Sequence, residues 1–380
     1  MRGTAAYLIT VFLLFTTSVA KAQELDSAYL ARVQDTVDRY YDRHPRKRLS
    51  SEDRRFAVMP LYGVMYTQET GLLAMGGFMG SYRSSADTLV PESSVGAVAM
   101  LSVNLSGAGA VMGKWYSGPG NFLLEYSVIF KNSPRRFWGL GYADASDECN
   151  LTSFTGRNLR AEAQFLYRGG RRILAGGLAG YDYSDAVDFG SDALVDGLPL
   201  RSHYLYAGVR FSYDSRDDTS EPSRGVFLEA VQKLYLPLVD VPLFASTEVT
   251  ADFYFALWKG CVAAVDLYGA FTSRGAPWML WPLSGGDVRL RGYYQGRYRD
   301  RNLMSAQIEL RQHVYGGHGV VVWGGAGNVF PSFRSLDIKS TLPTYGAGYR
   351  FSIWGVVFRL DAGFGTRGQW SLTAGVNHSF

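Results

Sequence analysis

The chain has 380 residues and a formal net charge of +4, which falls to +2 when Arg2 and Lys21 of the first 22 positions are set aside. A charge this small gives no support to nucleic-acid binding. Its 44 glycines, 25 tyrosines and 22 phenylalanines exceed what an ordinary soluble domain carries. They suit a membrane-spanning β-barrel, which uses small inward residues and aromatic girdles.

Residues 1–22 are predicted to be a signal peptide. Arg2 supplies the positive charge, residues 7–15 form an apolar run, and Ala20 and Ala22 are the small residues expected before a cleavage point. The run is shorter than the about 20 apolar residues that a membrane-spanning helix needs. The rest of the chain has no apolar run of about 18 residues either. Strands are therefore expected to cross the membrane.

Residues 23–55 are predicted to form a periplasmic leader with one short amphipathic helix over residues 24–44. Apolar residues from Leu25 to Tyr40 recur at three- to four-residue spacing, and Pro45 ends the pattern. The helix could rest under the barrel, insert into its lumen, or be a loose leader. The residue pattern leaves these alternatives open.

From Phe56 the apolar period becomes two, which predicts an all-β transmembrane antiparallel barrel over residues 56–380. An even number of strands with both ends in the periplasm is the bacterial arrangement. We predict sixteen strands, at residues 57–66, 71–83, 95–106, 109–117, 120–131, 157–168, 171–184, 202–214, 225–236, 245–257, 260–272, 302–313, 318–328, 345–352, 355–363 and 369–380.

Connection lengths alternate as this count requires. Connections after even-numbered strands are mostly short and should face the periplasm, with 84–94 and 215–224 as exceptions. Connections after odd-numbered strands are mostly long and should face outward, at 132–156, 185–201, 273–301 and 329–344. The brief connection after the first strand, and the one predicted at Gly107-Ala108, leave open a slip in the count near the N-terminus.

The last predicted strand, residues 369–380, alternates clearly. Trp370, Leu372, Ala374, Val376 and Phe380 share one parity and are expected to face lipid, with His378 as a polar interruption near the interface. A terminal aromatic such as Phe380 resembles the C-terminal signal that outer-membrane barrels present to their insertion machinery.

Two motifs carry a family resemblance. Arg291-Gly292-Tyr293 falls in the sixth outward loop, between the eleventh and twelfth predicted strands. The turn between the eighth and ninth strands contains Asp214, Arg216, Asp217, Pro222 and Gly225. In order and placement these motifs resemble the BamA/TamA-type outer-membrane assembly-factor superfamily. The resemblance implies that the sixth loop folds back into the lumen and that its arginine meets inward-facing acids.

The alternation of residues along the strands predicts which acidic side chains point into the lumen, where Arg291 could meet them. Glu309 and Arg311 in the twelfth predicted strand, and Arg359 and Asp361 in the fifteenth, alternate with apolar residues and should point inward. Arg291 could pair with either carboxylate and hold the loop in place. The alternative is that these are lumen charges solvated by water.

The chain departs from the family pattern at two places. The thirteenth strand keeps the family's aromatic as Trp323, but Gly325 stands where the resemblance implies an aspartate. Residues 23–55 are also expected to be too short for one of the family's periplasmic polypeptide-transport-associated domains. We therefore expect a short form of the barrel without the usual receptor.

No catalytic residue, metal site or cofactor is expected, and we predict that the chain is not an enzyme. No nucleophile-elbow motif occurs. His313 and His318 flank a predicted periplasmic turn and could bind a metal ion, but the simpler interpretation is that they are solvated turn residues. Cys149 and Cys261 are expected to be unpaired, although a disulfide between them stays open.

Three functions remain for a protein of the bacterial outer membrane. The first is help with the insertion or translocation of proteins or lipids, with outer-membrane lipid, lipopolysaccharide and a separate periplasmic subunit or client protein as partners. The second is a passive channel or small-solute transporter. The third is a structural or surface-antigen barrel without transport. The sequence does not name a client or a solute.

Overall fold

The computed structural model describes residues 56–67, 71–84, 90–103, 106–118, 120–170, 172–191, 193–219, 221–353 and 356–380. The predicted signal peptide and leader helix lie outside these residues. No helix in the described part of the chain is long and apolar enough to cross a bilayer.

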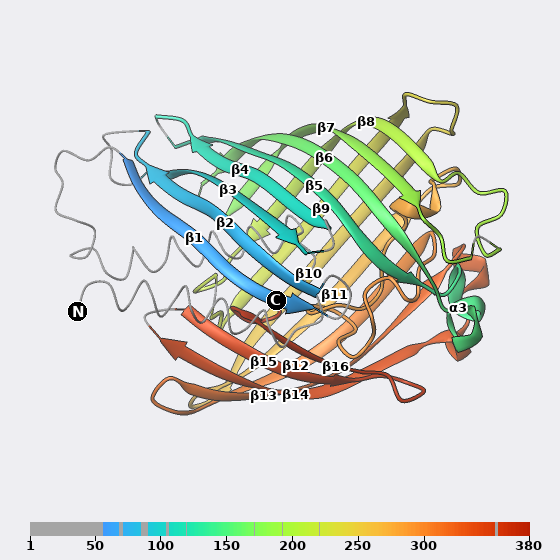
Figure 1. Ribbon diagram of the computed structural model, residues 1–380. Helices are drawn as coiled ribbons and strands as arrows, with labels where there is room; N and C mark the ends of the chain where they lie inside the picture. Colours follow the sequence, from blue (N-terminus) through green and yellow to red (C-terminus); the bar gives the residue numbers. More distant parts are fainter. Residues whose placement is uncertain are drawn as a thin grey trace.

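Sixteen antiparallel strands form one sheet in chain order, which confirms the predicted fold class and strand count. Figure 1 shows this sheet curling into a barrel whose edges are β1 and β16. Within the described residues no strand ladder joins these two edges. The strands are β1 (Phe56–Thr67), β2 (Gly71–Tyr82), β3 (Ser93–Ser102), β4 (Gly107–Tyr116), β5 (Phe122–Phe137), β6 (Thr152–Gly169), β7 (Ile173–Val187), β8 (Arg201–Asp214), β9 (Gly225–Pro237), β10 (Phe244–Trp258), β11 (Cys261–Thr272), β12 (Asn302–Tyr315), β13 (His318–Phe330), β14 (Leu342–Ile353), β15 (Val356–Phe364) and β16 (Trp370–Val376).

Two connections differ most clearly from their predicted positions. Gly107 and Ala108 begin β4 instead of linking it to β3, and the ladder between these strands starts at the pair Leu101 and Gly107. The connection between β5 and β6 shrinks to residues 138–151, because the strands stay paired as far as Phe137 and Thr152. Neither change alters the strand count.

We call the two ends of the barrel the turn end, where connections follow even-numbered strands, and the loop end, where they follow odd-numbered strands. The loop end carries the short helices: α3 (Gly141–Ala145), η1 (Glu148–Asn150), η2 (Trp278–Leu280), η3 (Phe333–Ser335) and η4 (Ile338–Ser340). Figure 1 places α3 at this end. The long connections are therefore gathered at one end of the barrel.

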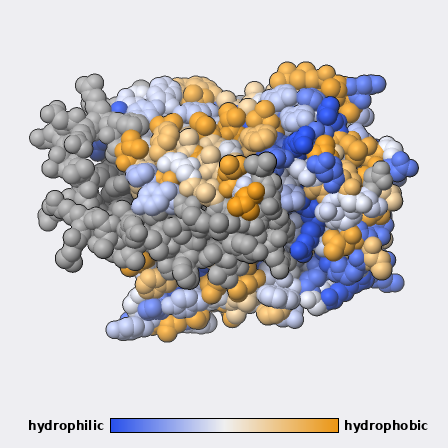
Figure 2. Space-filling view, in the orientation of Figure 1, coloured by the Kyte–Doolittle hydropathy of each residue, from blue (hydrophilic) through white to orange (hydrophobic). Residues whose placement is uncertain are grey.

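The strands place apolar side chains outside and charged ones inside. On β12, Met304 and Ile308 are 42% and 50% exposed, whereas Gln307, Glu309 and Arg311 are buried. An arginine on the lipid face would cost about 2–4 kcal/mol at the bilayer midplane, so alternation fixes which face turns inward. Figure 2 shows hydrophobic side chains over the strand wall and hydrophilic ones gathered toward the loop end.

The last strand is shorter than predicted and the chain then turns inward. β16 ends at Val376, and Asn377 has a φ of +63°, in the left-handed region. Asn377 still donates its backbone N–H to the Val357 carbonyl oxygen at 2.7 Å, after which residues 378–380 leave the sheet. The prediction that Phe380 and the flanking His378 continue the lipid-facing strand is therefore wrong. Alternation alone could not reveal this, because one left-handed residue is enough to redirect a chain.

Both cysteines are free, as expected. Cys149 is exposed at the loop end and Cys261 is buried at the start of β11.

Candidate functional site in the barrel lumen

Arg291 of loop six (residues 273–301) lies fully buried in the lumen against three strands. Its guanidinium donates to Glu309 of β12 at 2.7 Å and to Asp361 of β15 at 3.0 Å. It also stacks on the Trp323 ring of β13, with 3.7 Å from the guanidinium carbon to the ring centroid. The arginine thus meets both carboxylates that residue parity had placed inward.

Three further arginines surround the same carboxylates and form with Arg291 what we call the latch cluster. Their contacts are Arg311 to Glu309 at 2.8 Å, Arg350 to Asp361 at 2.5 Å, Arg359 to Asp361 at 3.6 Å, and Arg359 to Asp287 of loop six. A buried charge is tolerated only when it is paired and hydrogen-bonded. Here each wall carboxylate has at least two cationic neighbours, so the loss of one still leaves a partner.

The residues after Arg291 dock on neighbouring backbone. Gly292 has a φ of +113°, and a Cβ there would lie 2.7 Å from the main chain of Phe364. The Tyr293 hydroxyl donates to the Pro343 carbonyl oxygen at 2.6 Å and accepts from the Thr366 backbone N–H at 3.0 Å. The triplet therefore uses charge, close backbone approach and a buried hydroxyl to attach loop six to the wall.

Gly325 leaves no room for the aspartate that the resemblance implies. A Cβ at this position would lie 2.6 Å from the carbonyl oxygen of Ala306. The Gln307 side chain in the facing strand donates instead to the Asp266 carboxylate at 3.1 Å and to the Val288 carbonyl oxygen at 3.0 Å. The carboxylates that reach Arg291 come from β12 and β15.

Loop six has a second charged anchor that sequence reasoning missed. Arg289 binds both carboxylate oxygens of Asp266, with contacts of 2.7 and 2.9 Å, and stacks on the Tyr268 ring at 3.9 Å. Asp266 sits between the apolar Val265 and Leu267 of β11, and this alternation is the signal that could have placed it inward. The loop is therefore held on β11 as well as on β12 and β15.

The last residues of the chain form hydrogen bonds with arginines of the latch cluster. Ser379 accepts hydrogen bonds from Arg291 and Arg359 at 2.8 Å each. Arg311 donates to the main-chain oxygen of Phe380 at 2.8 Å and lies 5.1 Å from its ring. Residues 377–380 thus fill lumen space beside the cluster instead of extending the lipid-facing wall.

The turn between β8 and β9 is held by its own carboxylates. Asp214 accepts from the backbone N–H of Arg216 at 3.0 Å and from its guanidinium at 2.6 Å. Asp217 accepts from the backbone N–H groups of Ser223 and Arg224 at 2.9 and 3.1 Å. Gly225 has a φ of +113° and closes the turn. These contacts build the shape of the turn.

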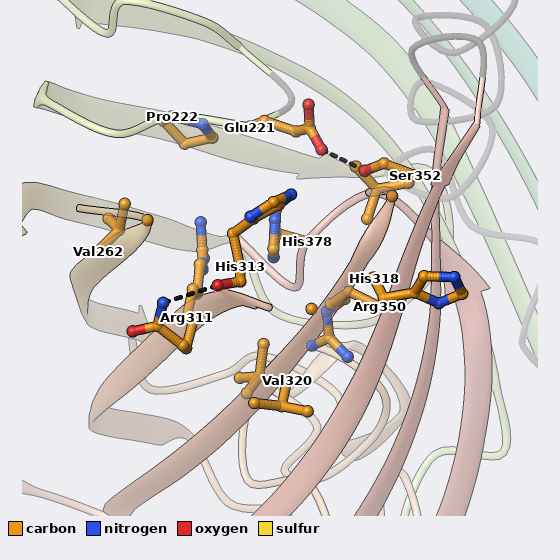
Figure 3. A pocket seen from close by; sticks show the side chains of 16 residues that line it. Glu221, Pro222, Val262, Arg311, His313, His318, Val320, Arg350, Ser352 and His378 are labelled. Carbon is orange, nitrogen blue, oxygen red and sulfur yellow. Dashed lines mark hydrogen bonds between the residues drawn. The ribbon is translucent and has the colours of Figure 1, made fainter. Parts of the chain in front are cut away.

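This turn reaches across the turn end to β14. The Ser352 hydroxyl donates to Glu221 at 2.5 Å, a contact shown as a dashed line in Figure 3. Glu221, Ser352 and Pro222 all line a cavity of about 130 Å³. Figure 3 shows the side chains of Arg311, Arg350 and His378 around it. The turn and the chain's last residues therefore meet at the turn end of the lumen.

Histidines do not form a metal cluster in the described part of the chain. His313 contacts the Gly316 carbonyl oxygen at 2.6 Å and lines the small cavity with His318. His378 comes within 3.9 Å of Glu309. The sequence had left open a metal ion between His313 and His318. Among the described residues, no third ligand lies close enough to complete such a site.

At the loop end, loop six packs against the connection between β5 and β6. Arg297 donates to Glu148 at 2.7 Å and to the Ala145 carbonyl oxygen at 3.1 Å, and it stacks on Trp138 at 4.8 Å. The hydrogen bond from Arg297 holds the pKa of Glu148 below its usual value; burial raises it by less, and the Trp138 N–H lowers it further. Charged and aromatic contacts thus bind two long loops together over the lumen.

The single sheet of sixteen antiparallel strands has the fold of solved BamA and CdiB structures. The chain is similar to the crystal structure of BamA from Haemophilus ducreyi lacking POTRA domains 1–3, with a TM-score of 0.62 and 14% identity over 86% of this chain and 71% of that one. It is also similar to CdiB from Acinetobacter baumannii (TM-score 0.53, 13% identity, 85% and 59% covered) and CdiB from Escherichia coli (TM-score 0.56, 12% identity, 86% and 64% covered).

The chain spans less than two thirds of either CdiB chain. At these low identities the likeness is one of fold. No protein-family profile matches the sequence, and no curated protein matches it significantly.

Proposed function

We propose that this barrel resides in the bacterial outer membrane and assists the insertion or translocation of proteins or lipids there. The proposal rests on loop six, which lies in the lumen. The loop is anchored at its Arg-Gly-Tyr triplet and also before and after it in the sequence. Arg289 and Arg291 bind wall carboxylates, and Arg297 binds the neighbouring loop. A general porin needs a wide aqueous path, and a loop pinned in this way narrows it.

The apolar exterior and the barrel fold support the proposed location. Outer-membrane lipid and lipopolysaccharide are the proposed partners of that surface. A client protein or a separate periplasmic subunit is the proposed partner of the turn end. The proposal assigns no catalytic residue and no cofactor to the chain.

A reconstitution experiment tests the proposed activity. The full chain is placed in lipid vesicles, and the folding of an added, urea-denatured outer-membrane barrel is followed by its heat-modifiable gel mobility. We expect faster client folding than in empty vesicles. A loss of this acceleration is expected for Arg291→Ala but not for Arg334→Ala, which changes an exposed arginine of the 331–341 loop. Equal rates with and without the protein would contradict the proposal.

Affinity purification tests the partner. A stoichiometric periplasmic protein or a trapped client should co-purify after cross-linking in cells. Recovery of the barrel alone would refute the version that needs a separate subunit.

A passive channel is the second candidate, because one side of the lumen wall is lined with charged side chains. Arg210 links Glu125 and Glu229 at 2.9 and 2.7 Å across β5, β8 and β9. Planar-bilayer recordings separate the two functions. A large steady conductance of the unmodified protein would favour the channel, whereas near-zero conductance that rises in Arg291→Ala favours the loop-anchored barrel.

A further inference from the structure

The outer face of β6, β7 and β8 carries charge at one level only. These strands lie side by side in the barrel wall (Figure 1). Their even-numbered residues, such as Asn158 and Asp182, face loop six in the lumen, so the odd-numbered ones face outward. The charged residues among those outward positions are Arg157, Asp185 and Arg201. We call these three residues the outer arginine row.

The outer arginine row is continuous and lies near the loop end. Asp185 is directly opposite Arg157 in the ladder of β6 with β7, and directly opposite Arg201 in the ladder of β7 with β8. Arg201 is the first residue of β8. An outward arginine costs about 2–4 kcal/mol at the bilayer midplane but only about 0–1 kcal/mol near an interface. The row therefore marks the level of the lipid head groups at the loop end.

Aromatic side chains place the interface at the same level. One residue pair closer to the turn end, Tyr183 and His203 are directly opposite each other, with ring centroids 4.6 Å apart. The Tyr181 hydroxyl contacts Nδ1 of His203 at 3.0 Å. Rings with one polar tip gather where the apolar part of a bilayer meets its head groups.

The two guanidinium groups of the row are presented outward, whereas its carboxylate is covered. The side chain of Asp185 is only 5% exposed, and that of Arg201 is 63% exposed. Asp185 accepts from Arg201 at 3.3 Å and from the Tyr183 hydroxyl at 3.1 Å. Arg157 is exposed and forms no ion pair within the part of the chain that the structure describes. Two accessible cations above one covered anion complement a negatively charged group.

The wall beside the row is apolar toward the turn end. On β8 the outward positions that follow Arg201 and His203 include Leu205, Val209 and Phe211, all of them exposed. One strand thus leads from a cation through a polar aromatic level to apolar side chains. This order of side chains matches the order of head group and acyl chain in a single lipid.

We propose that the outer arginine row binds the phosphorylated head group of a glycolipid in the outer leaflet, namely lipopolysaccharide, whose acyl chain lies along Leu205 and Val209. The guanidinium groups of Arg157 and Arg201 suit a phosphate because their planar forks match its oxygens. The inference rests on the proposed outer-membrane location and adds a specific lipid site to it. The site is separate from the latch cluster and needs no client protein.

Native mass spectrometry of the full chain in an uncharged maltoside detergent tests the site. The probe is lipid A, the phosphorylated lipid part of lipopolysaccharide, and its dephosphorylated form and phosphatidylglycerol are the comparisons. We expect saturable binding of lipid A, at least about tenfold tighter than of either comparison lipid. Equal affinity for the dephosphorylated form would overturn the phosphate assignment, and equal affinity for phosphatidylglycerol would overturn the glycolipid assignment.

Variants locate the binding. Arg157→Gln with Arg201→Gln should weaken lipid A binding at least about tenfold. The matched control, Arg334→Gln with Lys339→Gln, removes two exposed charges from the 331–341 loop and should leave binding unchanged. Heat-modifiable mobility reports the folded fraction of every variant.

A change of opposite sign keeps the test decisive if the double variant folds poorly. Asp185→Asn removes the negative charge of the row at nearly constant shape and should tighten lipid A binding severalfold, a gain that misfolding cannot produce. Unchanged binding in both the double variant and Asp185→Asn, or no saturable binding of lipid A to the unmodified chain, would overturn the proposal.

Cell fractionation separates this failure from that of the proposed function. A chain that is found in the outer membrane but does not bind lipid A refutes the lipid site alone. A chain that is absent from the outer membrane refutes the location on which both proposals rest.

Discussion

Removal of the Arg291 side chain should lower the free energy of unfolding of the barrel by an amount that can be estimated from its contacts. Breaking a buried ion pair costs about 3–5 kcal/mol when the remaining charge has no other partner. Here Glu309 keeps Arg311 at 2.8 Å, and Asp361 keeps Arg350 at 2.5 Å. The cost of Arg291→Ala is therefore expected at the lower end, about 3 kcal/mol, or a factor of about a hundred in the ratio of folded to unfolded protein.

Urea unfolding of the purified barrel in detergent, followed by heat-modifiable mobility, measures this change. Arg334→Ala is the matched control and should change stability by no more than about 0.5 kcal/mol, as exposed substitutions usually do. Limited trypsin digestion should also cut loop six faster in Arg291→Ala. A stability loss below about 0.5 kcal/mol together with unchanged digestion would refute the view that the latch cluster holds the loop.

Three further outcomes follow from the same geometry. Gly292→Ala, at a φ of +113°, should destabilise the barrel by about 1–3 kcal/mol in urea unfolding, while Gly324→Ala, which meets open space, should not. Arg289→Ala should speed trypsin cleavage of loop six, and unchanged digestion would show that the latch cluster suffices alone. Because Arg297 lowers the pKa of Glu148 in the folded state, their contact stabilises the loop end above the ordinary glutamate pKa of about 4.3 and is lost as pH falls through the lower folded value. Pepsin cleavage of residues 138–151 should thus rise steeply below about pH 4, relative to a Glu148→Gln variant whose cleavage lacks this step.

The strands were predictable because each leaves a period-two signature with apolar residues on the lipid side. The inward placement of Glu309 and Asp361 follows from the same parity. Which carboxylate meets which arginine does not follow, because it depends on how the sheet curves. The pairing of Arg289 with Asp266 was missed for this reason.

The end of the chain shows a different limit of sequence reasoning. Apolar residues keep the alternating parity through Val376 and again at Phe380, so the pattern predicts one uninterrupted strand. The inward turn depends on a single left-handed residue, Asn377, and on the arginines that receive Ser379 and the Phe380 main chain. Such long-range partners carry no local sequence signal.

Because two carboxylates bind Arg291, substitutions around it have a particular consequence. Two carboxylates on different strands bind one guanidinium, so neither position alone is indispensable. A substitution that removes one of these acids therefore leaves the guanidinium paired with the other, so loop six keeps an anchor on the wall. For substitutions at this site, the number of carboxylates that reach Arg291 therefore matters more than which strand carries each of them.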